Sequence, residues 1–180
     1  MSTLKILAVN FSSRQDGNCG NIMKLVGRLL DNVSSVTFSE LQIAPCGTCN
    51  YECFTHRDAC PHIGDSIFSL YEKICSSDSV LFIIPNYCDY SCSNFFVFNE
   101  RSNCYFQQHP ELLNKYLDID KKFIVISNTN TTHFEDILSQ QVNGRPNILF
   151  LSPKAFGKNS INGDILESPE AVDLVEEFVK

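Results

Sequence analysis

Short apolar runs alternate with amphipathic helical segments along this chain of 180 residues, and the alternation restricts the possible folds more than any other feature. Four runs are almost continuously apolar, which is typical of parallel strands covered on both faces. They span residues 4–9, 80–84, 123–126 and 148–151. A fifth stretch, residues 36–41, alternates between apolar and polar side chains, and we interpret it as an edge strand.

Apolar residues also recur at every third or fourth position, as they do along one face of a helix. Four such patterns span residues 22–33, 67–75, 134–142 and 171–179. Thr132 and Glu135 form a capping-box pattern at the start of the third helix, and Ser168 followed by Pro169 is typical of the start of the fourth. A fifth helical segment, residues 95–106, has too many aromatic residues for one helix face, so it is either buried all round or meets a partner.

The resulting order of strands and helices predicts a parallel sheet with right-handed crossovers and helices on both faces. The length fits a single domain, residues 1–180. In such sheets ligands bind beyond the carboxyl ends of the strands, near the point where the strand order reverses. The loops that follow the strands are therefore the places where function is expected.

Composition excludes several classes of function. The formal net charge is −7 and the basic residues are scattered, so we expect no nucleic-acid partner. No apolar run approaches the roughly 20 residues that span a bilayer, so we expect no membrane partner. The N-terminus lacks a signal-peptide pattern, and we expect a cytoplasmic protein whose 9 cysteines are thiols, metal ligands or redox groups rather than structural disulfides.

The loop after the first strand, residues 10–19, combines hydroxyl, amide and cationic side chains ahead of a helix. A helix N-terminus favours an anion, because its first N–H groups lack partners and its dipole is positive there. The loop matches neither G-x-G-x-x-G nor the P-loop, and it suits one phosphomonoester better than a pyrophosphate or triphosphate. An ordinary polar loop with a capped helix fits the same spacing, so both interpretations stay open.

Two further loops suit a flat ligand. Residues 85–93 combine aromatic side chains, small residues and backbone donors, and such a loop can lie along a heterocycle and bond its edge. The alternative is a surface turn whose aromatic rings tuck into the core. Residues 127–132 are unusually polar, and they either close a ligand site or cap the next helix.

Three segments together resemble the flavodoxin-like family of NADPH-dependent FMN reductases. Ser12-Ser13-Arg14, followed after a spacer by Gly17-Asn18-Cys19, is similar to the family's phosphate loop, which reads Ser-Pro-Arg, a short spacer and Gly-Asn-Thr or Gly-Asn-Ser. Residues 84–88 resemble the family's Pro-x-Tyr loop, and residues 161–170 read like family C-termini. The resemblance implies a three-layer α/β sandwich with a five-stranded parallel sheet in the order 2-1-3-4-5.

The resemblance also implies an FMN site in these loops. The phosphate would be held by Ser12, Arg14, Asn18 and the N–H of Cys19, with Gly17 permitting the turn. The flavin ring would be lined by Pro85, Asn86, Tyr87 and Cys88, and approached from its other side by Ser127, Asn128 and Thr129. Ser13 replaces the family's usual Pro, and Cys19 replaces its usual hydroxyl residue.

The activity implied by the resemblance is that of an NAD(P)H-dependent FMN reductase. FMN would accept hydride from NAD(P)H and pass electrons to a small acceptor such as a quinone or free flavin. We expect no catalytic side chain, because the flavin carries the chemistry. Relatives dimerise near the aromatic helix, residues 95–106, so we also expect a homodimer; the alternative is burial of this helix within the monomer.

Four of the cysteines lie close together in the loop after the second strand. Cys46, Cys49, Cys53 and Cys60 have the spacing C-x2-C-x3-C-x6-C, which resembles the cysteine motif of iron–sulfur flavoproteins with one extra residue. Three interpretations stay open: a metal-free loop, a [4Fe–4S] cluster, or zinc. With a cluster, the protein would be an electron-transfer iron–sulfur flavoprotein. A third hypothesis is a metal-stabilised binding module that has lost its flavin.

Overall fold

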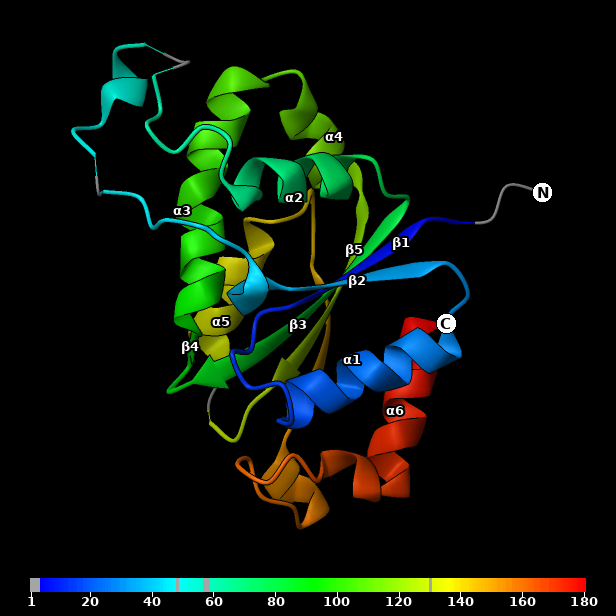
Figure 1. Cartoon of the computed structure of the whole chain (residues 1–180). Coiled ribbons are helices and arrows are strands. Elements are labelled where there is room, and N and C mark those ends of the chain that lie inside the picture. The colour runs from blue at the N-terminus through cyan, green and yellow to red at the C-terminus, as the bar shows by residue number, and fades with distance from the viewer. Residues whose placement is uncertain (1–3, 48, 57–58, 130) are drawn as a thin grey trace.

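The computed structural model describes residues 4–47, 49–56, 59–129 and 131–180. Five parallel strands form its central sheet in the order β2-β1-β3-β5-β6 (Figure 1). In chain order they are β1 (Ile6–Asn10), β2 (Val33–Thr37), β3 (Ser79–Tyr87), β5 (Asp120–Ile126) and β6 (Asn147–Leu151). A two-residue strand, β4 (Tyr90–Ser91), pairs antiparallel with the end of β3. Leaving β4 aside, this is the predicted order 2-1-3-4-5, and the predicted α/β fold is confirmed.

Helices cover both faces of the sheet, as Figure 1 shows. One face carries α1 (Asn18–Leu29) and α6 (Pro169–Val179). The other carries α2 (Ser66–Cys75), α3 (Ser93–Gln108), α4 (Leu112–Asp118) and α5 (Thr132–Ser139). No helix within the described residues is both long and apolar enough to cross a membrane.

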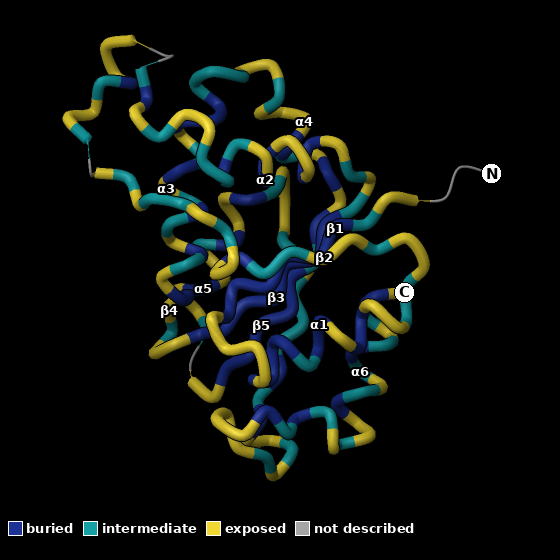
Figure 2. Tube along the Cα trace, viewed as in Figure 1, coloured by how far each residue is buried: buried dark blue, intermediate teal, exposed yellow. Residues whose placement is uncertain are grey.

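The central strand β3 is apolar at almost every position because it contributes to two cores. Val80, Phe82 and Ile84 belong to the cluster under α2 and α3, whereas Leu81 and Ile83 belong to the cluster under α1 and α6. All five are buried, and Figure 2 shows the central strands β1, β3 and β5 as mostly buried. Burying a large apolar side chain contributes about 1.5–3 kcal/mol. Because β3 is covered on both faces, its sequence is almost continuously apolar instead of alternating, and this is the pattern from which the strand was predicted.

The predicted boundary between the first helix and the second strand was wrong by several residues. Helix α1 ends at Leu29, and Asn32 then adopts a left-handed backbone with φ 57°, so Val33 begins β2 instead of continuing the helix. Strand β2 ends at Thr37, and residues 38–40 form a 3-10 turn that buries Phe38 against Phe11, with ring centroids 5.3 Å apart. The edge position is confirmed, since β2 pairs with β1 at one end of the sheet.

Helix starts were predicted with mixed success. Ser168 caps α6, because its side chain accepts a hydrogen bond from the Ala171 N–H. Thr132 is not the cap of α5: it is the first helical residue, with Thr131 before it, and the helix ends at Ser139 rather than at residue 142. The carboxylate of Asp89, from the β3–β4 turn, accepts from the His133 N–H in the first turn of α5 at 3.4 Å.

Burial within the chain accounts for most of the aromatic residues of α3. Phe95, Phe98, Tyr105 and Phe106 are buried, and the Phe98 ring stacks on Tyr71 with centroids 4.8 Å apart. Phe96 is 43% exposed. The homodimer stays a prediction.

Candidate functional site

A cavity of about 320 Å³ opens beyond the carboxyl ends of β1, β3 and β5. Asn10 at the end of β1 pairs with Ile83, and Pro85 in β3 pairs with Ile126 in β5, so the three strands end close to one another. After β1 the chain continues into α1 on one face of the sheet, and after β3 it continues into α3 on the other face. A parallel sheet of this order binds ligands at the point where the connections change faces in this way. The lining residues are Ser12, Arg14, Gly17, Asn18, Cys19, Pro85, Asn86, Tyr87, Cys88, Ile126, Ser127, Asn128, Thr129, Pro153, Ser160 and Ile161.

All twelve residues predicted for an FMN site are among those that line the cavity. Four lining residues were not predicted: Ile126, Pro153, Ser160 and Ile161. Ile126 is simply the end of a strand whose apolar pattern was recognised. The other three come from the segment after β6, where no local pattern indicates that the chain returns to the site.

The loop after β1 is held by its own side chains. The Asn10 side-chain oxygen accepts from the Ser12 N–H at 2.9 Å, and the Ser12 hydroxyl accepts from the Arg14 N–H at 3.1 Å. A Cβ on Gly20 would lie 2.0 Å from the carbonyl oxygen of Gln15, so only glycine lets the loop fold back this tightly on α1. The first residues of the helix, Asn18 and Cys19, are thereby placed against the cavity.

Asn18 is buried, and its two amide atoms differ in their partners. Its Oδ1 accepts from the Ile165 N–H at 3.0 Å. Its Nδ2 has no hydrogen-bond partner among the described residues. A buried donor without a partner costs roughly 1–3 kcal/mol. Since Asn18 lines the cavity at the N-terminus of α1, an acceptor bound there would satisfy this donor.

Arg14 supplies a cation at the rim of the cavity. Its side chain is exposed, and its Nη2 donates to the carbonyl oxygen of Ile161. The same segment is fixed further along, where Gly163 accepts from the Asn21 side chain at 2.7 Å. Residues 159–165 therefore form a strap that crosses the side of the cavity lined by the loop after β1.

The far end of the cavity is a connected set of amides and hydroxyls. Asn86 donates to the Ser127 hydroxyl at 2.8 Å, and that hydroxyl accepts from the Thr129 N–H at 3.1 Å. Asn128 ties this loop to the strap, because its Nδ2 donates to the Ser160 hydroxyl. The two loops predicted to lie on either side of a flat ring are thus joined to each other.

The turn between β3 and β4 has an unusual backbone. Cys88 and Asp89 both adopt left-handed conformations, with φ 53° and 67°. Each such non-glycine residue costs roughly 1–2 kcal/mol. The turn holds Tyr87 at the cavity with more than half of its side chain exposed. Two consecutive residues with positive φ are what the favoured two-residue turn of a β-hairpin requires, and Tyr87 pairs with Tyr90 on either side of this turn.

Two buried thiols near the cavity, Cys19 and Cys92, are not activated. Burial raises the pKa of Cys92 to about 11, and burial together with the neighbouring Cys92 raises the pKa of Cys19 further. Cys92 donates from its Sγ to the carbonyl oxygen of Phe11 at 3.3 Å. Both thiols are therefore protonated near neutral pH and are poor nucleophiles.

The four loop cysteines gather in space without forming a metal-binding arrangement among the described residues. Burial raises the pKa of Cys53, and the neighbouring Cys60, Cys46 and Cys49 raise it further in that order. No group of three or more His, Cys, Asp or Glu side chains within the described part of the chain is arranged to hold a metal ion. Residues 48, 57 and 58 of this loop lie outside the described residues.

No protein-family model and no curated protein sequence matches this chain. Solved structures do match over almost its whole length. The Trp repressor binding protein from Bacillus subtilis has a TM-score of 0.67 at 16% identity, covering 98% of this chain and 99% of that one. The fold is flavodoxin-like.

Two other matches are named for their chemistry. The FMN-dependent NADH-azoreductase from Bacillus anthracis, in complex with FMN, has a TM-score of 0.65 at 9% identity and covers 96% of each chain. The flavoenzyme NAD(P)H:(acceptor) oxidoreductase FerB from Paracoccus denitrificans has a TM-score of 0.54 at 16% identity, covering 98% of this chain and 95% of that one. At these identities, the matches establish the flavodoxin-like fold.

Proposed function

We propose that this protein is an FMN-dependent NAD(P)H oxidoreductase that reduces a small acceptor such as a quinone or free flavin. The observation that carries the proposal is the buried Nδ2 of Asn18 at the N-terminus of α1, which has no hydrogen-bond partner within the described part of the chain and belongs to a residue that lines the cavity. The matching azoreductase, named as FMN-dependent and solved with FMN, supports the choice of cofactor. The name of FerB, an NAD(P)H:(acceptor) oxidoreductase, supports the choice of reaction.

The residues at the α1 end of the cavity fit a phosphomonoester. Asn18 offers an unused N–H donor, and the helix N-terminus adds the positive end of its dipole. Arg14 adds a full positive charge at the rim, where it donates to the Ile161 carbonyl. A phosphate would compete with that carbonyl for the guanidinium and would bind it more strongly, because a phosphate carries a full negative charge and can accept two parallel hydrogen bonds from the guanidinium.

The residues at the other end fit a flat heterocycle. Pro85 and Tyr87 present apolar surface, and the joined side chains of Asn86 and Ser127 fix the edge where polar ring atoms would bond. When bound, FMN would supply the hydride chemistry. The chain's own part is then to orient the ring, to exclude water from one of its faces and to leave the other open for NAD(P)H and the acceptor.

The visible absorption spectrum tests the proposal directly. The protein, purified anaerobically with FMN present, should show two resolved flavin bands that bleach on addition of NADPH. Arg14→Ala should weaken FMN binding at least about tenfold, because it removes a charge-assisted hydrogen bond worth roughly 1.5–3 kcal/mol. Arg28→Ala is the matched control, since Arg28 is an exposed cation in the last turn of α1, at the opposite end of that helix from the Arg14 loop.

Two results would contradict the proposal. A protein that stays colourless and takes up no FMN would refute the function while leaving the fold intact. Unchanged FMN affinity in Arg14→Ala would show that the phosphate is not held where we propose.

The mutual proximity of the loop cysteines favours one second candidate, an iron–sulfur flavoprotein that transfers electrons. Its prediction is iron and acid-labile sulfide bound to the anaerobically reconstituted protein, together with a broad brown absorption under the flavin bands. Reconstituted protein without iron would reject this candidate and leave the FMN reductase proposal unaffected.

A further inference from the structure

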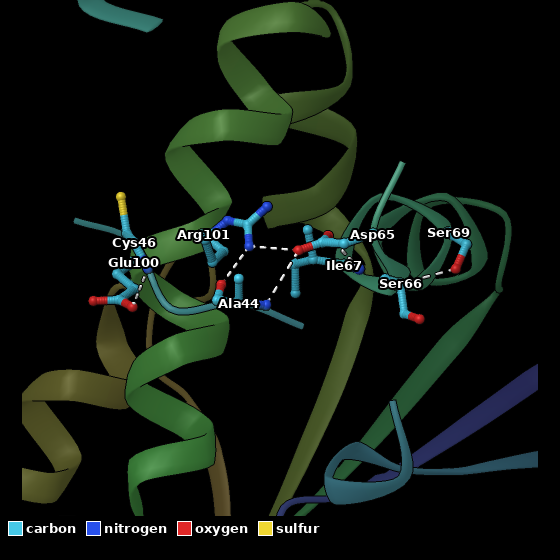
Figure 3. A network of polar contacts seen from close by, with 8 residues as sticks. All are labelled: Ala44, Cys46, Asp65, Ser66, Ile67, Ser69, Glu100 and Arg101. Atoms are coloured by element: carbon cyan, nitrogen blue, oxygen red, sulfur yellow. Dashed lines mark hydrogen bonds and ion pairs between the residues drawn. The ribbon is translucent and has the colours of Figure 1, made fainter. Parts of the chain in front are cut away.

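Several cations of this acidic chain are used by the fold itself. Arg101 is fully buried, and its Nη1 donates to the Asp65 carboxylate at 2.6 Å and to the Ala44 carbonyl (Figure 3). The ammonium groups of Lys121 and Lys122 donate to backbone carbonyl oxygens. A bound anion therefore depends on cations that lie elsewhere, and their position shows where such a ligand can bind.

A second cavity, of about 520 Å³, adjoins the first and is formed mainly by the segment that follows β6. Asn128 and Ser160 line both cavities, and the Asn128 Nδ2 donates to the Ser160 hydroxyl between them. All the side chains that line the second cavity are polar or charged, and we call it the polar basin. Its other lining residues are Lys154, Gly157, Lys158, Asn159, Asn162 and Asp164.

A tight turn places the two lysines of the polar basin. Gly157 ends the 3-10 turn after β6 with a left-handed backbone, φ 68°. The chain reverses there, and the Lys158 N–H donates to the Pro153 carbonyl at 2.8 Å. The Lys154 N–H donates to the Asn128 Oδ1 at 3.0 Å. Hydrogen bonds thus fix the backbone of both lysines at the edge of the first cavity.

The polar basin has a surplus of positive charge. Lys154 is exposed, and its ammonium has no ion pair within the described part of the chain. Lys158 pairs with Glu167 at 2.7 Å, but the Glu167 side chain is 69% exposed, so water and salt screen the pair. Asp164 is the one carboxylate among the lining residues, and it accepts from the Asn159 N–H at 3.2 Å. Two ammonium groups therefore face one carboxylate that already holds the backbone.

The proposed FMN site leaves these two lysines unused. The single phosphate of FMN is assigned to the α1 end of the first cavity, with Arg14 and Asn18. The polar basin lies on the other side of the contact between Asn128 and Ser160. The Ser160 hydroxyl accepts from Asn128, so its own hydrogen can point to a ligand oxygen. Among the substrates of the proposed reaction, the pyridine dinucleotide is the one that always carries phosphate groups.

We propose that the polar basin binds a phosphate group of NAD(P)H through Lys154 and Lys158. The identity of the ligand rests on the proposed function, whereas the anion site rests on the lining residues alone. Because the two cavities meet at Asn128 and Ser160, a dinucleotide can lie across this contact, with its nicotinamide ring toward the flavin and its phosphates in the basin. The diphosphate of both dinucleotides and the 2′-phosphate of NADPH offer the same chemistry, anionic oxygens that two ammonium groups can bind.

Isothermal titration calorimetry with the oxidised dinucleotides tests the basin without any turnover. The full chain, loaded with FMN, is titrated with NADP⁺ and separately with NAD⁺. Lys154→Gln and Lys158→Gln should each weaken the binding of at least one dinucleotide about tenfold, because each removes a hydrogen bond between ionised partners. FMN affinity should stay unchanged. Lys115→Gln is the matched control, since Lys115 is an exposed cation of α4, at the far end of the molecule from the basin (Figure 1).

Removal of Glu167 tests the same charges in the opposite direction. Glu167→Gln frees Lys158, so the dinucleotide should bind about two- to fivefold more tightly, as expected when an exposed ion pair no longer competes. A poorly folded variant cannot produce tighter binding. Glu170→Gln makes the same change in charge at an exposed position in the first turn of α6, and it should leave the affinity unchanged.

The titrations also distinguish the two kinds of phosphate. Equal losses for NADP⁺ and NAD⁺ would place the diphosphate in the basin, and a loss confined to NADP⁺ would place the 2′-phosphate there. Lysine variants that bind both dinucleotides as tightly as Lys115→Gln, or an unmodified chain that binds neither, would overturn the proposal. Failure of the proposed function gives a different result. A chain that takes up no FMN, yet binds NADP⁺ through the two lysines, would keep the basin and refute the FMN reductase.

Discussion

Asn18 joins two parts of the molecule that are far apart in sequence, and each of its amide atoms has a different task. The oxygen holds the Ile165 N–H, and thereby the strap, against α1. The nitrogen is the donor that has no partner among the described residues. A substitution that keeps the oxygen and replaces the nitrogen therefore separates packing from ligand binding.

Asn18→Asp is that substitution. The carboxylate keeps an acceptor for Ile165 but loses the donor and adds a negative charge facing the proposed phosphate. We expect FMN affinity to fall at least about 30-fold, because a lost charge-assisted bond of roughly 1.5–3 kcal/mol is joined by repulsion. Quenching of flavin fluorescence measures the affinity. Asn147→Asp, an exposed change at the start of β6 with the same effect on net charge, serves as control. Equal affinity of Asn18→Asp and the control would remove Asn18 from the phosphate site.

At the scale of elements, the strap of residues 159–165 depends on one glycine. Gly163 has φ 74°, and a Cβ there would lie 2.2 Å from the carbonyl oxygen of Asp16. Gly163→Ala should push the strap away from the loop after β1. We expect weaker FMN binding and faster hydrogen exchange over residues 159–165, with a loss of stability of about 1–3 kcal/mol from the strained backbone and the clash together.

Gly157 provides the matched control for that change. It has a similar left-handed backbone, with φ 68°, but a Cβ at this position would meet no described atom within 4 Å. Gly157→Ala should therefore show the backbone penalty alone and leave FMN binding unchanged. If the two variants lose FMN affinity equally, the contact between strap and loop has no part in binding.

Features that depend on local sequence patterns could be predicted from the sequence, whereas features that depend on contacts between distant residues could not. The order of elements and the three loops of the site were predictable, because a parallel sheet brings the loops after β1, β3 and β5 to one edge whatever the details. The start of β2 was not, because Val33 continues the apolar period of α1 and the helix is ended by the left-handed Asn32. Ile161 was missed because its contact with Arg14 spans 147 positions and leaves no local pattern.

At the scale of the whole molecule, buried titratable groups set the dependence of stability on pH. Burial raises the pKa of Cys92 to about 11 and that of Cys104 to about 12, from an ordinary value of 9.0. These thiols stay protonated in the fold while they ionise in the unfolded chain. Their contribution is therefore fully present below about pH 9 and is lost as pH rises toward their folded pKa values. Burial acts oppositely on Lys121, whose pKa it lowers from 10.5 to about 8.

Lys121 and the thiols should together give a stability maximum on the alkaline side of neutrality. The buried ammonium of Lys121 donates to the carbonyl oxygens of Tyr116 and Ile119, yet the unfolded chain binds its proton more tightly. Stability should thus rise from about pH 8, as the folded lysine loses its proton. Above about pH 9 the thiols outweigh it, because each group changes the slope by at most about 1.4 kcal/mol per pH unit and several thiols oppose one amine.

Urea unfolding across this range, with a reductant present, measures the balance. We expect the free energy of unfolding to peak between about pH 8 and pH 9 and to fall at higher pH. Lys121→Met should remove the rise and leave the alkaline fall. Cys92→Ala should make the fall shallower without moving the rise, since the two groups titrate over different ranges. A free energy that keeps rising above about pH 10 would contradict the assignment of protonated thiols to the folded core, and a rise that survives in Lys121→Met would assign it to a group other than the buried lysine.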